Sequence, residues 1–428
     1  MASGSWRWKV AGSALLLACA EASPEGLTPG QGVDAGGQSC QDLPLGAAGD
    51  RPVKAGWPQV LGTVHCLDYD GVVPDTTDDP YVVTIETYRR HLQAAKARGF
   101  AALTMEKALE IADGKAPWAL MPERPLLLFS DVTAQVFADH AAPVLRELGY
   151  RATIGLETAI LPQPWAMSIQ TLKGLEAEGF EIASHSHSHV DLTALSPAQL
   201  EVEVDGARAI LQGHGFEAKH YIYPLGAWNA AVVARVEAAG HLAARATGSP
   251  DIRGGGFASF DPARRFKLGC ALPVATSTDA EVLAYLDDRR IQVEDAFVTQ
   301  ADGGANGTIE PANFGADTFR SLPLHDAGDS IRVRFLVRRG GTYHLRLRVK
   351  RGTSAAPSGA DAGYRYHLDG AAMAHRPRCA TVPEPSLDTV VWGEHDLDAT
   401  DLDPGWHELV VTALTDWSVV IDWLDVSP

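Results

Sequence analysis

The chain has 428 residues, of which 46% are hydrophobic and 21% charged, and its formal net charge is −18 at neutral pH. This composition is that of a globular protein, and the length exceeds what one hydrophobic core usually supports, so we expect two domains. The negative charge excludes a nucleic-acid-binding protein, because recognition of a phosphate backbone needs clustered Lys and Arg side chains.

The N-terminus carries an export signal. Arg7 and Lys9 precede an apolar run that ends at Ala18 and is too short to span a membrane. The run closes with LLAC, which resembles the lipobox of bacterial lipoproteins, whose cysteine, here Cys19, is acylated. The alternative is an ordinary signal peptide cleaved nearby. Both interpretations predict an exported protein, lipid-anchored in a bacterial cell envelope or secreted, with no membrane contact beyond the anchor.

Residues 1–19 form this signal, and residues 20–50, rich in Gly, Pro, Ser and Ala, are expected to be a flexible linker. Export makes disulfides possible. The remaining cysteines, Cys40, Cys66, Cys270 and Cys379, allow three pairings between which the sequence does not decide. Cys66 lies in an apolar run and is equally compatible with a buried free thiol.

From residue 51 to residue 288, apolar runs alternate with amphipathic stretches. Strands are predicted for QVLGTVHCL, RPLLLFSDV, RATIGLET and EIASHS, with helices between them. Ser196, Pro197 and Gln199 have the spacing of a capping box that begins a further helix. This alternation predicts a largely parallel sheet covered by helices, with the chemistry at the carboxyl ends of its strands.

Residues 289–428 follow another pattern. In SIRVRFLVRRGGTYHLRLRVKRG, apolar and charged residues alternate on both sides of the Gly340–Gly341 turn, which predicts a hairpin with one buried face. Further short strands and turns follow. We therefore expect a β-sandwich in this part of the chain.

Three local motifs accompany the first pattern. In EIASHSHSHVDLTALSP, the spacing His-Ser-x-x-His falls on His185 and His189; in LLLFSDV, Asp131 follows Ser130 at a strand end; YPLG begins at Tyr223. Together with the order of the elements, these motifs resemble the polysaccharide deacetylases of the NodB-homology type, carbohydrate esterase family four. The resemblance covers roughly residues 55–285 and implies a distorted (β/α) barrel.

The histidine spacing indicates a metal site. Two histidines four apart on a helical turn project from one face, and Asp131 from a neighbouring strand end completes a His, His, Asp set with open positions. Such a set suits a catalytic divalent metal, most often zinc. His187 is expected on the other side of the turn. The alternatives are an extended strand that directs all three histidines one way, and a solvated histidine loop without metal.

The resemblance also implies an activity, the removal of acetyl groups from an N-acetylated or O-acetylated polysaccharide. It assigns the metal to Asp131, His185 and His189, the oxyanion donor to the backbone of Leu225, and the acid to His65. His65 lies in an apolar strand, where a histidine is also commonly a core residue. The substrate-binding residues implied by the third motif and its surroundings are Tyr223, Pro224 and Trp228.

The position of the general base departs from the family pattern. The aspartate that serves as general base is replaced by Ser130, whose hydroxyl does not accept a proton near neutral pH, and loss of a general base costs about 100- to 10,000-fold in rate. Glu157, Asp68 and Asp70 are candidate substitutes. The competing hypothesis is a non-catalytic, metal-containing surface lipoprotein that binds polysaccharide, and a protein that stores or senses metal is a third.

The C-terminal part resembles jelly-roll carbohydrate-binding modules of families six and thirty-five, in the phrases GTYHLRLRV, LDPGWHELVV and VVIDWLDV. The resemblance implies sugar binding, although a purely structural sandwich has the same alternation. The aromatic residues available to stack on a sugar ring are Trp392, Trp406, Trp417 and Trp423.

Overall fold

The structure is a computed structural model. It describes residues 60–61, 63–75, 78–117, 120–246, 258–259, 264–287, 291–292, 297–299, 310–311, 320–324, 328–351, 364–384, 387–414 and 419–427. Cys19, the signal and the linker lie outside the described residues. In the part of the chain that the structure describes, no helix combines the length and the apolar character needed to cross a membrane.

The first domain is built on a parallel sheet with the strand order β10-β9-β8-β7-β6-β2, in which β5 also pairs with β6. The strands are β2 (Thr63–Asp68), β5 (Phe100–Leu103), β6 (Arg124–Ser130), β7 (Thr153–Leu156), β8 (Glu181–Ser184), β9 (His220–Ile222) and β10 (Ala243–Arg245). β11 (Ala258–Ser259) pairs antiparallel with β2, and β3 (Gly71–Val73) pairs with β4 (Val82–Thr84). Every residue of β6 is buried, as expected for a strand covered on both faces.

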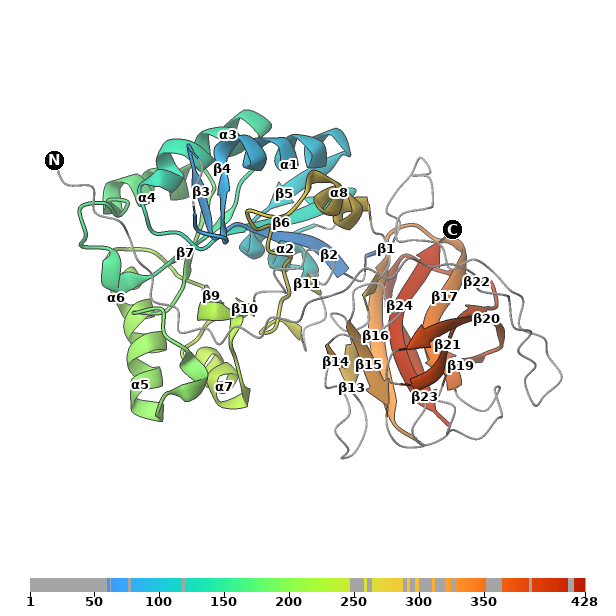
Figure 1. Cartoon of the computed structure of the whole chain (residues 1–428). Coiled ribbons are helices and arrows are strands. Elements are labelled where there is room, and N and C mark those ends of the chain that lie inside the picture. Colours follow the sequence, from blue (N-terminus) through green and yellow to red (C-terminus); the bar gives the residue numbers. More distant parts are fainter. Residues whose placement is uncertain are drawn as a thin grey trace.

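Helices cover this sheet, with α1, α3 and α4 along one side of it (Figure 1). The α-helices are α1 (Ile85–Ala97), α2 (Met105–Ala112), α3 (Ala142–Leu148), α4 (Ile169–Ala177), α5 (Pro197–Glu201), α6 (Ala207–Gly213), α7 (Ala230–Ala238) and α8 (Asp279–Asp287). The π-helical turns are η2 (Phe137–Ala141) and η5 (Val202–Gly206), and the 3-10 turns are η3 (Thr158–Ile160), η4 (Leu192–Ala194) and η6 (Pro224–Gly226). The predicted capping box is present, since the side chains of Ser196 and Gln199 each bind the other's backbone N–H at the start of α5.

The sheet curls until its two ends meet. Leu268 bridges to Arg245 at the end of β10, and Ala271 bridges to Leu67 in β2, so one short segment joins the first and last strands. Between them, Cys270 forms a disulfide with Cys66 of β2, with Cα atoms 4.6 Å apart. The disulfide selects one pairing for Cys66 and overturns the free-thiol alternative. This closure brings residues of β10 and β2 to the same point inside the barrel.

The second domain consists of two antiparallel sheets. One contains β1 (Val60–Leu61), β13 (Phe297–Thr299), β16 (Ser330–Val337), β18 (Tyr364–Leu368), β19 (Ala371–Met373) and β23 (Gly405–Ala413). The other contains β12 (Ile291–Gln292), β14 (Glu310–Pro311), β15 (Arg320–Leu324), β17 (Gly341–Arg351), β20 (His375–Glu384), β21 (Leu387–Leu397), β22 (Thr400–Leu402) and β24 (Val419–Ser427). Apolar residues of both sheets share one core, with Phe335 from the first and Leu347 from the second. The predicted fold class, an α/β barrel followed by a β-sandwich, is confirmed. The hairpin predicted at Gly340–Gly341 is wrong, because β16 pairs with β23 and β17 pairs with β21 and β24, so the chain passes from one sheet to the other at this turn.

The two domains are joined through packed side chains. Leu336 of the sandwich belongs to the same buried cluster as Cys66 and Phe129 of the barrel, and Trp406 packs against that cluster. The Arg338 guanidinium donates to two backbone carbonyls of the barrel, those of residues 121 and 122. β1, which precedes the barrel in the chain, pairs with β16 and so belongs to a sheet of the sandwich. Trp406, considered for sugar stacking, therefore contributes to the domain junction.

Of the other tryptophans considered for sugar binding, Trp417 lies outside the described residues, and the side chains of Trp392 and Trp423 are not described.

Candidate active site

The two motif histidines lie together beyond the end of β8. The rings of His185 and His189 are 4.7 Å apart between centroids. Nδ1 of His185 lies 3.0 Å from the carbonyl oxygen of Ile222, an arrangement in which Nδ1–H donates and Nε2 keeps its lone pair. Burial lowers the pKa of His185 to about 4 and also lowers that of His189, so both rings are neutral near pH 7 and suited to metal coordination.

The backbone that brings these rings together differs from the predicted helical turn. Residues 185–190 contain no helix. Instead, Ser186 and His189 have φ angles of 67° and 55°, in the left-handed region that non-glycine residues rarely adopt. The Ser186 hydroxyl accepts the N–H of His189 at 3.0 Å and stabilises this turn. The predicted convergence of the two histidines is therefore reached through a strained loop, of the kind found at functional sites.

The middle histidine has other partners. Nδ1 of His187 lies 2.9 Å from the hydroxyl of Thr158, and its backbone N–H donates to Glu203 at 3.0 Å. Glu203 also accepts the backbone N–H and the hydroxyl of Ser188. This buried carboxylate, in the π-helical turn η5, thus binds the histidine loop at three points. This role was not predicted from the sequence, because Glu201 and Asp205 flank Glu203 and no local pattern distinguishes it from them.

Asp131 faces the histidines from the end of β6. Its Oδ2 lies 3.8 Å from Nε2 of His185 and accepts from the guanidinium of Arg245. Its Oδ1 is buried, with no hydrogen-bond partner among the described residues. A Cβ added at Gly155 of β7 would lie 3.2 Å from this Oδ1 and 3.3 Å from Cβ of His185. The close approach of Asp131 and His185 therefore depends on a glycine at position 155.

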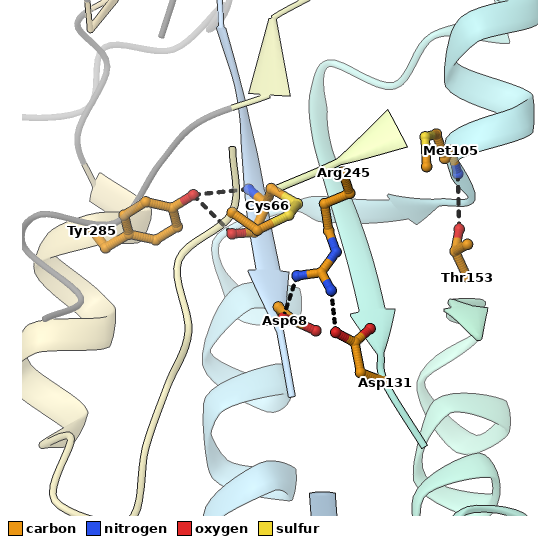
Figure 2. Close-up of a disulfide and its surroundings, with 8 residues drawn as sticks. Cys66, Asp68, Met105, Asp131, Thr153, Arg245 and Tyr285 are labelled. Carbon is orange, nitrogen blue, oxygen red and sulfur yellow. Dashed lines mark hydrogen bonds and ion pairs between the residues drawn. A yellow bond between two sulfur atoms is a disulfide. The ribbon is translucent and has the colours of Figure 1, made fainter. Parts of the chain in front are cut away.

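Arg245 is a central residue of the site that the sequence analysis missed. Its side chain is fully buried and forms ion pairs with Asp68 of β2 and with Asp131, which follows β6. Figure 2 shows the guanidinium between these two carboxylates, beside the strand that carries Cys66. Because the contact to Asp68 spans 177 positions of sequence and depends on barrel closure, no local pattern could reveal it.

A third carboxylate joins this cluster. Asp68, Asp70 and Asp131 each offer an oxygen within 4.8 Å of the others. Burial raises the pKa of Asp70 to about 7, and the charge of Asp131 adds to that shift. Burial also raises the pKa of Asp68, against the opposing effect of Arg245. Glu157, the other substitute considered for the missing base, is not part of this cluster.

Ser130 connects two of these strands. Its buried hydroxyl donates to the backbone carbonyl of Tyr69 at 3.1 Å, and the N–H of Tyr69 donates to the carbonyl of Phe129 at 3.1 Å. The serine at the position of the family's base thus holds the segment between Asp68 and Asp70 against β6.

The third motif presents only part of its length to solvent. Tyr223 is buried, and its hydroxyl donates to the carbonyl of Phe266 at 3.1 Å; Pro224 is buried as well. Leu225 is 64% exposed and has a φ of 58°, again in the left-handed region. Trp228 is 39% exposed, and the ammonium of Lys267 lies 4.7 Å from the centroid of its ring. Leu225 and Trp228 are accessible to a ligand, whereas Tyr223 and Pro224 are buried.

His65 lies apart from this cluster. It is buried in β2, with Nε2 2.9 Å from the carbonyl oxygen of Tyr285 and with the rings of Phe100 and Tyr285 packed edge-on at 5.0 and 5.2 Å. Its neighbours are those of a satisfied core histidine. The acid role expected for His65 has no support in this geometry.

Residues 121–244 match the sequence family described as polysaccharide deacetylase. The chain contains a polysaccharide deacetylase domain. This family is one of hydrolases that act on carbon–nitrogen bonds. The match includes Asp131, both motif histidines and Leu225.

Individual relatives are distant. The Bacillus subtilis protein YxkH, named as a polysaccharide deacetylase, is 24% identical over 156 residues, which are 36% of this chain and 54% of that protein. The alignment therefore spans about half the length of that relative. Among solved structures, a Streptococcus pyogenes deacetylase in complex with acetate has 17% identity and a TM-score of 0.47, covering 52% of this chain and 98% of its own. A Bacillus cereus polysaccharide deacetylase has 19% identity and a TM-score of 0.44, covering 52% and 69%.

The donor set of the deacetylase domain fits a divalent cation. Two neutral imidazoles and a carboxylate with an unpartnered, buried oxygen are ligands that zinc and similar ions accept. The hydrogen bond from Nδ1 of His185 to Ile222 is the outer-sphere contact usual for a ligating histidine. When all are ionised, three carboxylates face a single guanidinium, which leaves two negative charges for a divalent ion to balance.

Proposed function

We propose that this protein is an exported, divalent-metal-dependent deacetylase that removes acetyl groups from an N-acetylated or O-acetylated polysaccharide. The observations that carry the proposal are the approach of Oδ2 of Asp131 to Nε2 of His185, the ring of His189 beside that of His185, and the buried, unpartnered Oδ1 of Asp131 beside Gly155. The match of residues 121–244 to the polysaccharide deacetylase family supports the reaction class.

In this proposal, Asp131, His185 and His189 hold the metal, and zinc is the ion their chemistry favours. A divalent ion there supplies a Lewis acid that polarises the acetyl carbonyl and lowers the pKa of water. Other residues of the chain hold the two histidine ligands in position. Glu203 holds the histidine loop in its strained conformation through three hydrogen bonds, and Ile222 fixes the tautomer of His185.

The left-handed backbone at Leu225 lies at the exposed end of β9, where its N–H is the candidate donor to the carbonyl oxygen that becomes negative during attack. Trp228, three residues further, offers a half-exposed indole for the apolar face of a sugar ring. The sandwich packs against the barrel, and we propose that it contributes to polysaccharide binding. Cys19 is the proposed lipid-anchoring residue.

Acetate release tests this function. Purified protein is incubated with N-acetylglucosamine oligomers and with acetylated xylan, with and without a chelator, and released acetate is measured. We expect release that the chelator abolishes and that zinc restores. His185→Ala should abolish release, and His187→Ala, a neighbouring histidine outside the metal set, should retain it. Metal binding without acetate release from either polymer would instead support the non-catalytic, polysaccharide-binding alternative.

A further inference from the structure

Two carboxylates stand at the end of β2, beside the proposed metal set. Asp68 is the last residue of the strand, and Asp70 follows it by two positions. Both offer an oxygen within 4.8 Å of a carboxylate oxygen of Asp131. The buried Oδ1 atoms of Asp68 and Asp131 have no hydrogen-bond partner among the described residues, so the cluster contains unsatisfied acceptors next to a reactive centre.

The residue that replaces the family's base takes part in this arrangement. Ser130 donates its hydroxyl to the carbonyl of Tyr69, the residue between the two aspartates, and the N–H of Tyr69 is bound to Phe129. The peptide that separates Asp68 from Asp70 is therefore tied to β6 on both sides. A serine at position 130 cannot supply a carboxylate, but it fixes the segment that carries two of them.

The two aspartates differ in their exposure to solvent and therefore to a bound substrate. Asp68 is fully buried, and its Oδ2 is held by Arg245. Asp70 is partly exposed, so it can contact a bound substrate and water. Glu157 lies outside the cluster. Of the three carboxylates that could replace the missing base, Asp70 alone lies in the cluster and is partly exposed.

We propose that Asp70 is a catalytic residue that supplies, from just beyond β2, the carboxylate missing at position 130, and that Ser130 positions it. This inference rests on the proposed deacetylase function. As water attacks, its oxygen bonds to the acetyl carbon, the carbonyl electron pair moves to the carbonyl oxygen, and the water proton passes to Asp70. When the carbonyl reforms and the bond from the acetyl carbon to the sugar nitrogen breaks, the proton held by Asp70 passes to that nitrogen, which gives acetic acid and a free amine and, after transfer of the acid proton to the amine, acetate and an ammonium group.

The test compares four proteins, namely the wild type, Asp70→Asn, the double variant Asp70→Asn with Ser130→Asp, and the control Asp75→Asn, whose carboxylate is exposed just after β3. Each is assayed for acetate release, bound zinc per chain and melting temperature. We expect Asp70→Asn to lose about 100- to 10,000-fold in kcat while keeping its zinc and its fold. The double variant, with a carboxylate returned to β6, should recover part of that loss, and Asp75→Asn should match the wild type.

Several results would overturn the inference. An Asp70→Asn protein with near wild-type kcat would show that Asp70 takes no part in the reaction, and loss of zinc from it would make Asp70 a metal ligand. If Asp70→Asn is unfolded, Asp70→Ser provides the same comparison. A wild type that releases no acetate would refute the proposed function and the role of Asp70 with it. An active wild type with an active Asp70→Asn variant would refute the role of Asp70 alone.

Discussion

Gly155→Ala tests whether the approach of Asp131 to His185 creates the metal site. The new methyl carbon would lie 2.8 Å from Cδ1 of Ile222, 3.2 Å from Oδ1 of Asp131 and 3.3 Å from Cβ of His185. The Ile222 contact can relax, since it involves the flexible end of a side chain. The other two contacts require Asp131 and His185 to move apart by a few tenths of an ångström.

The expected loss follows from that displacement. Changes to the groups that orient metal ligands cost about 10- to 100-fold in metal affinity, and we expect Gly155→Ala to fall in this range. The assay is a competition titration of zinc against a chromophoric chelator, combined with acetate release. Gly174→Ala is the matched control, because a methyl group there meets no atom within 4 Å. Equal zinc affinity in the wild type and Gly155→Ala would refute the placement of the metal between Asp131 and His185.

Three further predictions concern the loop, the disulfide and pH. Glu203→Gln should weaken zinc binding about 10- to 100-fold in the same titration, with the exposed Glu201→Gln as an unaffected control; equal losses in both would contradict the role of Glu203. Replacing Cys66 and Cys270 by Ser should lower the free energy of unfolding by about 2–5 kcal/mol in urea titrations, and an unchanged midpoint would count against the disulfide. Burial lowers the pKa of His241 to about 3, so below about pH 6.5 the unfolded chain binds a proton that the folded chain does not, and stability falls as the pH falls. His241→Gln should therefore lessen the stability difference between pH 7 and pH 5 by about 2 kcal/mol, and an unaltered difference would refute the buried neutral ring.

Local features of the fold could be predicted from the sequence. The capping box at Ser196 depends on residues three positions apart, and the alternation that predicts the strands on either side of Gly340 depends on neighbours two positions apart. The family motifs identified Asp131 because it follows a fully buried strand. In each case the deciding interactions lie within one or two elements.

Contacts that form only when the barrel closes could not be predicted from the sequence. Arg245 reaches Asp68 only because the segment near Leu268 joins β10 to β2, and the same closure pairs Cys66 with Cys270. The histidine loop shows another limit. The spacing of His185 and His189 suggested a helical turn, whereas left-handed backbone at Ser186 and His189, bound by Glu203, produces the convergence. Periodicity does not reveal such strain, because tertiary hydrogen bonds stabilise it.

The central claim is that Asp131, His185 and His189 hold one divalent ion on which deacetylation depends. The most direct test is to remove metal from the purified wild type with a chelator, remove the chelator, and titrate zinc back while measuring acetate release from N-acetylglucosamine oligomers. The account predicts no release without metal and a rise that levels off at one zinc per chain. Release that is unaffected by metal removal, or no release at any ratio of zinc to protein, would contradict it.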